Sequence, residues 1–189
     1  MEMKQQELIK KVKEKLERNI TDIENRTDLT REEKTSQIIH TFCAMCAAIA
    51  IQPIPFADIF ILTPIQAYMG TRLAAIHGIP VTEAKAKDII GDLFKVAGLG
   101  LMAQQLAIGA YKTGLPGLGG FMTIPLVYGL TYAVGNVLNL MFQARSKGKK
   151  LSHDELKKVF KESLKAGKKE GKARRGEIKS QSSATRHDV

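Results

Sequence analysis

The sequence contains no tryptophan and only two cysteines among 189 residues, and aromatic side chains make up 6% of it. Cys43 and Cys46 both lie in one apolar run, which indicates a reducing compartment and no disulfide framework. The scarcity of aromatic residues argues against recognition of single-stranded nucleic acid by base stacking.

Groupings of residues typical of enzymes and metalloproteins are also missing. The sequence shows no Ser/His/Asp set with a recognisable nucleophile turn, no paired histidine ligands and no carboxylate cluster in its apolar region. His40, Cys43 and Cys46 are spaced by three on one expected helix, but a metal site needs ligands that this spacing does not supply, so a structural role is favoured. We therefore expect a non-enzymatic protein with no catalytic residue, no metal and no cofactor.

The most prominent feature present is an apolar stretch from Leu93 to Phe142, divided by a glycine-rich turn at residues 114–120. Its second segment, Phe121–Phe142, holds 22 residues without a charged side chain. As a helix it would span about 33 Å, and a bilayer core is about 30 Å thick. The stretch predicts a helical hairpin that is membrane-embedded or membrane-associated; the alternative is the buried centre of a soluble helical bundle.

Small and amide side chains recur along one face of each hairpin segment at spacings of three and four. This seam is expected to let the two helices approach closely, with Asn136 or Asn139 satisfying the amide of Gln104. Its members are Gly100, Ala103, Ala107, Ala110 and Gly114 in the first segment, and Pro125, Gly129, Tyr132, Asn136, Asn139 and Gln143 in the second.

The chain before the hairpin shows helix signals. Residues 1–28 predict a charged amphipathic helix, and residues 29–144 an apolar helical domain. Thr30 and Glu33 have the spacing of a capping box that opens a helix running to about Ile51. The apolar stripe of the first helix, which suits pairing with another helix, comprises Leu8, Val12, Leu16, Ile20 and Ile23.

Pro53 and Pro55 end that second helix, because proline lacks a backbone donor and restricts the residue before it. The next helix is expected to start at an N-cap Thr63, with Pro64 and Gln66 at its first and third positions. Gly78 is expected to terminate it in the left-handed conformation, before a turn and a helix capped by Thr82.

Asp58 lies between Phe56 and Ile59, where a carboxylate is costly unless it is paired. Arg72, on the following helix, is the expected partner. The pair would clamp the proline-containing turn to that helix, and an interaction surface is the alternative role.

The C-terminal part, residues 145–189, carries fifteen basic and six acidic residues, so nearly all of the net charge of +10 lies there. Ser152 and Glu155 predict a capping box that opens a basic amphipathic helix within residues 145–167, ending at Gly167. Residues 168–189 are expected to be a disordered basic tail. Such an excess attracts anionic lipid headgroups or nucleic acid.

The proline-containing turn and the helix after it resemble a bacterial family, domain of unknown function 697, over roughly residues 35–144. The resemblance is carried by residues 53–58 (Pro-Ile-Pro-Phe-Ala-Asp), residues 62–66 (Leu-Thr-Pro-Ile-Gln), Met69, Arg72, Leu73 and residues 77–79 (His-Gly-Ile). In that family the domain often follows an Era-like GTPase domain, which implies an all-α domain, membrane association and a GTPase partner.

This sequence has no Gly-x-x-x-x-Gly-Lys-Ser/Thr phosphate loop, so the chain itself is not expected to bind GTP. We expect an accessory or anchoring partner of a GTPase that docks in trans, or a domain that self-associates, at the bacterial cytoplasmic membrane with both termini in the cytoplasm. The alternative is a soluble cytoplasmic adaptor that binds nucleic acid or ribosomal components through its basic tail.

Overall fold

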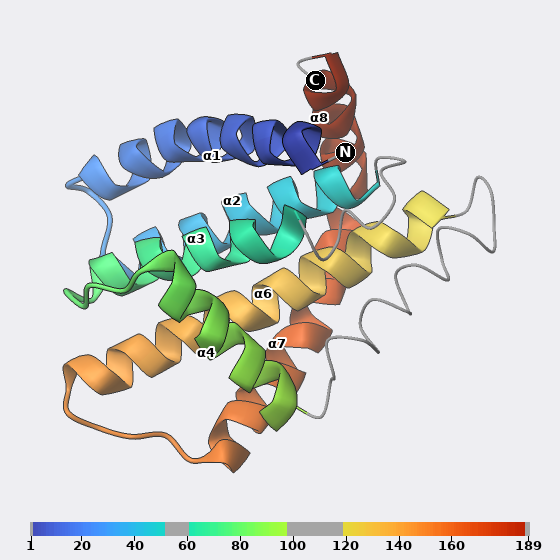
Figure 1. Ribbon diagram of the computed structural model, residues 1–189. Helices are drawn as coiled ribbons and strands as arrows, with labels where there is room; N and C mark the ends of the chain where they lie inside the picture. The colour runs from blue at the N-terminus through green and yellow to red at the C-terminus, as the bar shows by residue number, and fades with distance from the viewer. Residues whose placement is uncertain (1, 52–60, 98–118, 188–189) are drawn as a thin grey trace.

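The computed structural model describes residues 2–51, 61–97 and 119–187, and these ranges are helical with no strand among them. The expected all-α class is confirmed. Figure 1 shows the arrangement of the helices, which are α1 (Glu2–Asn25), α2 (Arg31–Ala50), α3 (Thr63–Ile76), α4 (Glu83–Val96), α6 (Gly119–Ser146), α7 (His153–Ala173) and α8 (Arg175–His187).

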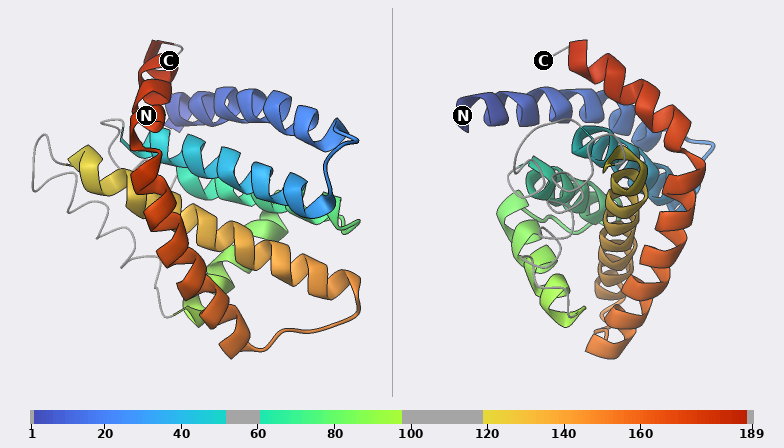
Figure 2. Two further views of the ribbon diagram at one scale, coloured as in Figure 1. Left: turned by 180° about the vertical axis from the view of Figure 1, so that it is seen from behind. Right: turned by 90° about the vertical axis from the view of Figure 1, so that its right-hand side faces the viewer.

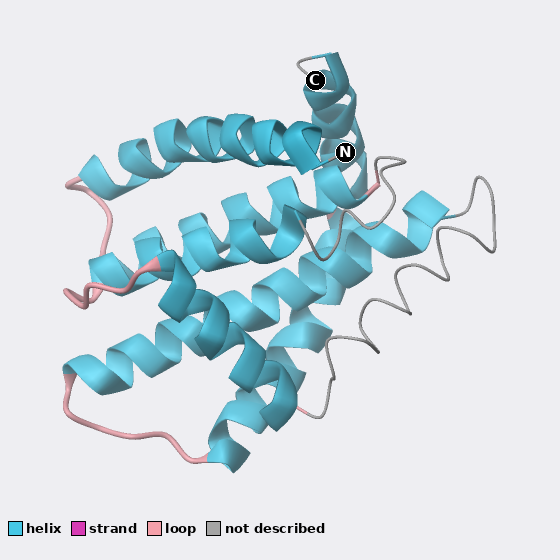
Figure 3. Ribbon diagram, in the orientation of Figure 1, coloured by secondary structure: helices cyan, strands magenta, loops and turns pink. Residues whose placement is uncertain are grey.

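Helix α6 lies at the centre of the bundle and packs against α2, α3 and α7. Helix α1 covers α2 and α3 from outside, and α4 packs against α3 and α7. The left view of Figure 2, seen from behind, shows α7 crossing in front of α6 and leading into α8, which reaches α2. The secondary structure is drawn by type in Figure 3.

The position of α6 in the core of the bundle is enough to explain why the helix is apolar. Residues 123–146 are long and apolar enough to cross a membrane, but 61% of the most apolar part is buried against the rest of the protein. A core helix of a soluble bundle has the same length and composition, so this one span is weak evidence for membrane insertion.

Local signals at several helix ends give the expected structure. Both capping boxes form, because Thr30 and Ser152 each accept a hydrogen bond from the backbone N–H of the glutamate three residues on. Gly78 has a φ of 70°, and the Ile79 N–H donates to the Ala74 carbonyl at 2.9 Å. This closure satisfies a carbonyl at the end of α3.

The start of α3 differs from the expectation. Thr63 is the first residue inside the helix, Leu62 occupies the N-cap position, and no side chain caps this end. Gln66 is buried and its Nε2 donates to Thr131 Oγ1 of α6 at 3.1 Å. Gln66 therefore joins α3 to α6, because a buried amide gains more from a tertiary partner than from a local cap.

Arg72, the expected partner of Asp58, pairs with Glu24 of α1. Arg72 Nε donates to Glu24 Oε1 at 3.0 Å, and a second contact joins its Nη2 to Glu24 Oε2. Both side chains are mostly buried, so this two-pronged ion pair fixes the end of α1 on α3. Asp58, Pro53 and Pro55 lie outside the described residues.

The expected end of the C-terminal helix at Gly167 is wrong. Helix α7 continues to Ala173 and α8 follows, so most of residues 168–189 is helical and not disordered. Gly167 and Gly171 are both buried against α6, and Ile178 of α8 is fully buried. This packing offsets the low helix propensity of glycine, which costs about 1 kcal/mol relative to alanine.

Candidate functional site

The strongest candidate for a functional surface is a face of α7 that carries every lysine of that helix. At about 100° per residue, these seven lysines fall within an arc of about 120°. All seven are exposed, and within the described ranges none takes part in an ion pair. This α7 lysine face consists of Lys157, Lys158, Lys161, Lys165, Lys168, Lys169 and Lys172.

Acidic residues hardly interrupt this face. Of the four in α7, only Asp154 falls within the arc, and it lies in the first turn of the helix. There the carboxylate of Asp154 interacts favourably with the positive end of the helix dipole. Beyond that turn the arc presents ammonium groups along about 22 Å of helix.

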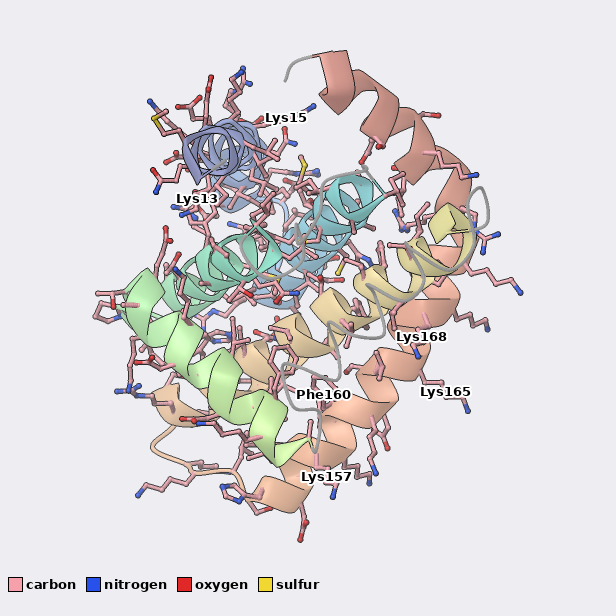
Figure 4. All side chains as sticks on the ribbon, turned by 45° about the vertical axis from the view of Figure 1, so that its right-hand side comes forward. Lys13, Lys15, Lys157, Phe160, Lys165 and Lys168 are labelled. Carbon is pink, nitrogen blue, oxygen red and sulfur yellow. The ribbon has the colours of Figure 1, made fainter. Side chains whose placement is uncertain are left out.

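The opposite face of α7 holds it on the protein. Leu156 and Phe160 are buried, and the Phe160 ring meets Phe94 of α4 edge-on, with centroids 6.2 Å apart. Figure 4 shows Phe160 on the inner side of α7 and Lys157, Lys165 and Lys168 on its outer side. The lysines are thus fixed on a rigid helix whose apolar face is already in use.

The second half of the expected seam, on α6, helps α7 to pack against the protein. A Cβ added at Gly129 would lie 3.0 Å from the Leu164 carbonyl oxygen and from the Lys168 nitrogen. Gly129 therefore lets the backbone of α7 approach α6 closely, as expected of a seam residue, but with α7 as the partner. Gly100, Ala103 and Ala107, in the first half of the seam, lie outside the described residues.

The two seam asparagines have separate partners. Asn136 Nδ2 donates to the Tyr132 carbonyl one turn earlier at 2.8 Å, so its amide is satisfied within α6. Asn139 Oδ1 lies 2.6 Å from His77 Nε2 and joins α6 to the end of α3. Their expected partner, Gln104, is not among the described residues.

The His40, Cys43 and Cys46 group has the structure of a core element. Both cysteines are fully buried and free, and burial raises the pKa of each thiol, that of Cys46 to about 12. His40 Nδ1 lies 2.6 Å from the Tyr128 hydroxyl. In the described part of the chain, no three His, Cys, Asp or Glu residues gather in a group that could hold a metal ion.

Both thiols should consequently resist modification in the folded protein. At about pH 8, a thiol with a pKa near 12 is ionised to roughly one part in ten thousand, and only the thiolate is reactive. We expect Ellman's reagent to label neither cysteine in buffer and both in denaturant, as followed by absorbance. Rapid labelling of either thiol in the native protein would contradict the buried, structural assignment.

The sequence predicted a basic helix within residues 145–167, and it wrongly assigned Lys168, Lys169 and Lys172 to a disordered tail. The available signal was that their spacing continues the same face beyond Gly167. It was outweighed because glycine and the lack of a continuing apolar stripe normally end a helix.

One family comparison gives a match. The family described as "Domain of unknown function (DUF697)" matches residues 14–169, from within α1 to near the end of α7. This range is wider than the resemblance over 35–144 and includes six of the seven lysines of the α7 lysine face. No curated protein and no solved structure matches the chain. A match over most of the chain establishes that this protein belongs to the DUF697 family.

Proposed function

We propose that this protein is a non-enzymatic, membrane-associated helical protein whose α7 lysine face binds the anionic headgroups of a lipid surface. The observation that carries the proposal is the exposure of seven lysines on one arc of a helix that is anchored by its other face. A basic residue near an anionic membrane contributes about 1 kcal/mol, so a row of them supplies useful affinity.

The composition of the face favours lipid over nucleic acid. The arc contains no arginine, and Phe160, the single aromatic residue of α7, is buried. Arginine forks and aromatic rings are what proteins use to read or stack bases, whereas lysine acts as a point charge toward phosphate. The straight axis of a helix also lets successive lysines approach one planar surface together.

Attachment is proposed to be peripheral for α7. Its apolar side chains pack on α6 and α4, so no amphipathic face remains to enter the bilayer. Binding should then be mainly electrostatic and should weaken as salt shortens the Debye length, from about 10 Å at 0.1 M to about 3 Å at 1 M.

The experiment is sedimentation of the full chain with vesicles of phosphatidylglycerol and phosphatidylcholine, with pure phosphatidylcholine vesicles as the control. We expect binding to the anionic vesicles alone, with loss of binding at high salt. Equal binding to neutral vesicles would overturn the electrostatic mechanism. Binding to duplex DNA at matched salt without binding to anionic vesicles would favour the alternative, a soluble nucleic-acid adaptor.

A second part of the proposal is that the protein serves as an accessory or anchoring partner of a GTPase at the cytoplasmic face of the bacterial inner membrane. Its support is the family's association with Era-like GTPase domains. The expected contact through the apolar stripe of α1 needs revision, because Leu8, Val12, Leu16 and Ile20 are buried on α2 and α3. The outer, charged side of α1 is the remaining surface of that helix for such a partner.

A pull-down from the native host tests this part. Recovery of a GTPase that is lost when the outward α1 charges Glu7, Lys10 and Glu14 are replaced by alanine would support docking there. If the unaltered chain and the variant both recover ribosomal components and no GTPase, the proposed GTPase partnership is rejected.

A further inference from the structure

A pocket of about 300 Å³ opens between α1, α2 and the junction of α7 with α8. It shares no residue with the α7 lysine face. Its floor on α2 is apolar and its rim is polar and charged, the usual composition of a small-ligand site. The lining residues are Lys15, Asn19, His40, Thr41, Ala44, Met45, Ala48, Arg174, Glu177 and Gln181.

Lys15 is the cation that α1 contributes. Its side chain is partly buried at the pocket, and among the described residues it forms neither an ion pair nor a hydrogen bond. Lys13, two residues earlier, instead pairs with both carboxylate oxygens of Glu83 at 2.7 Å. Because this ammonium group has no counter-charge among the described residues, it can pair with a bound anion.

Arg174 supplies the second cation, at the junction of α7 and α8. Its Nε donates to Glu170 Oε1 at 2.7 Å, while Glu177 Oε2 lies 3.9 Å from Nη1, beyond hydrogen-bond range. The outer edge of the guanidinium therefore keeps donors for another acceptor.

His40, on α2, lines the same pocket as these two cations. Its Nδ1 is engaged by the Tyr128 hydroxyl, which leaves Nε2 as the group that the ring can direct to a ligand. Burial lowers the pKa of His40 first, and the charge of Arg174 lowers it further, against an opposing effect of Glu170. A bound anion near His40 and Arg174 would offset the repulsion between the two cations and would raise the pKa of His40.

We propose that this pocket binds a phosphate monoester. A phosphate group carries nearly two negative charges and three strong acceptor oxygens, which matches donors that arrive from three directions on α1, α2 and the α7–α8 junction. A carboxylate offers one charge and two coplanar oxygens. The organic part of the ester lies against Ala44, Met45 and Ala48. The same chemistry occurs in soluble esters and in the headgroup of phosphatidic acid.

The test is calorimetry of the full chain with glycerol 3-phosphate, with glycerol and acetate as ligand controls. We expect binding of the phosphate ester alone, weakened at least tenfold by Lys15→Gln and by Arg174→Gln. Lys87→Gln, an exposed lysine on α4, should leave the affinity unchanged. We expect thermal melts of each variant to show that it remains folded.

A second readout is the His40 imidazole followed by NMR, where saturation with glycerol 3-phosphate should raise its pKa. Micelles of a short-chain phosphatidic acid provide the lipid arm, measured on a chain whose α7 lysines are replaced by glutamine. Binding of either ligand by that chain supports the pocket independently of the membrane proposal. The proposal is overturned if neither ligand binds, if acetate binds as tightly, or if both pocket variants bind as tightly as the unaltered chain.

Discussion

Replacing Lys157, Lys161, Lys165 and Lys168 together by glutamine is expected to weaken binding to anionic vesicles about a thousandfold. Each lysine near an anionic surface contributes about 1 kcal/mol, so four remove about 4 kcal/mol, and each 1.4 kcal/mol is a factor of ten in affinity. Glutamine keeps the helix propensity of lysine, and the four side chains are exposed. The fold should therefore be retained, as circular dichroism would show.

The matched control removes the same charge elsewhere. Four exposed lysines of α1 and α4 are replaced by glutamine, which lowers the net charge equally and leaves the α7 lysine face intact. We expect a change in vesicle affinity of less than tenfold in this control. If the two variants lose affinity equally, total charge and not the α7 face determines binding. The control positions are Lys10, Lys11, Lys85 and Lys87.

Gly167→Ala is expected to destabilise the protein by about 1–3 kcal/mol, the usual cost of overpacking. A Cβ at this position would stand 2.7 Å from Tyr132 Cβ and 2.9 Å from Gly129 Cα. The second of these is backbone, so relief requires α7 to move away from α6. Gly171 has the same relation to Tyr128, whose Cβ would lie 2.7 Å away, and Gly171→Ala should behave alike.

Gly91→Ala provides a control of opposite sign. Gly91 is inside α4, and a Cβ there would meet nothing within 4 Å. The gain in helix propensity, up to about 1 kcal/mol, should therefore appear as increased stability. Urea unfolding curves of the three variants measure both effects. If Gly167→Ala also stabilises the protein, helix propensity outweighs packing at this position, and α7 does not pack closely on α6.

The same crossing links stability to the proposed function. Vesicle binding depends on α7 being a formed helix with its lysines on one side, and the glycines are what place it there. A variant that loosens α7 from α6 should thus also lower vesicle affinity, although it alters no charge. The lysine variant should show the reverse pattern, with reduced affinity and unchanged stability.

The helical class and most of the helix ends could be predicted from local patterns in the sequence. The capping boxes at Thr30 and Ser152, the N-cap at Thr82 and the terminating Gly78 form as predicted. Each depends on hydrogen bonds between residues three to five apart, so the information is contained within one stretch of chain. The apolar stripe of α1 was also readable, because burial follows the helical period.

The partners that these helices contact could not be predicted in this way and are known from the packed structure. Arg72 pairs with Glu24, and Gln66 reaches Thr131 where a local cap was expected. Gly167, a stop signal in isolation, lies inside α7 because α6 presents Gly129 opposite it. These outcomes depend on residues 38 to 65 positions apart, and no local propensity encodes which of several acceptable partners will be brought into contact.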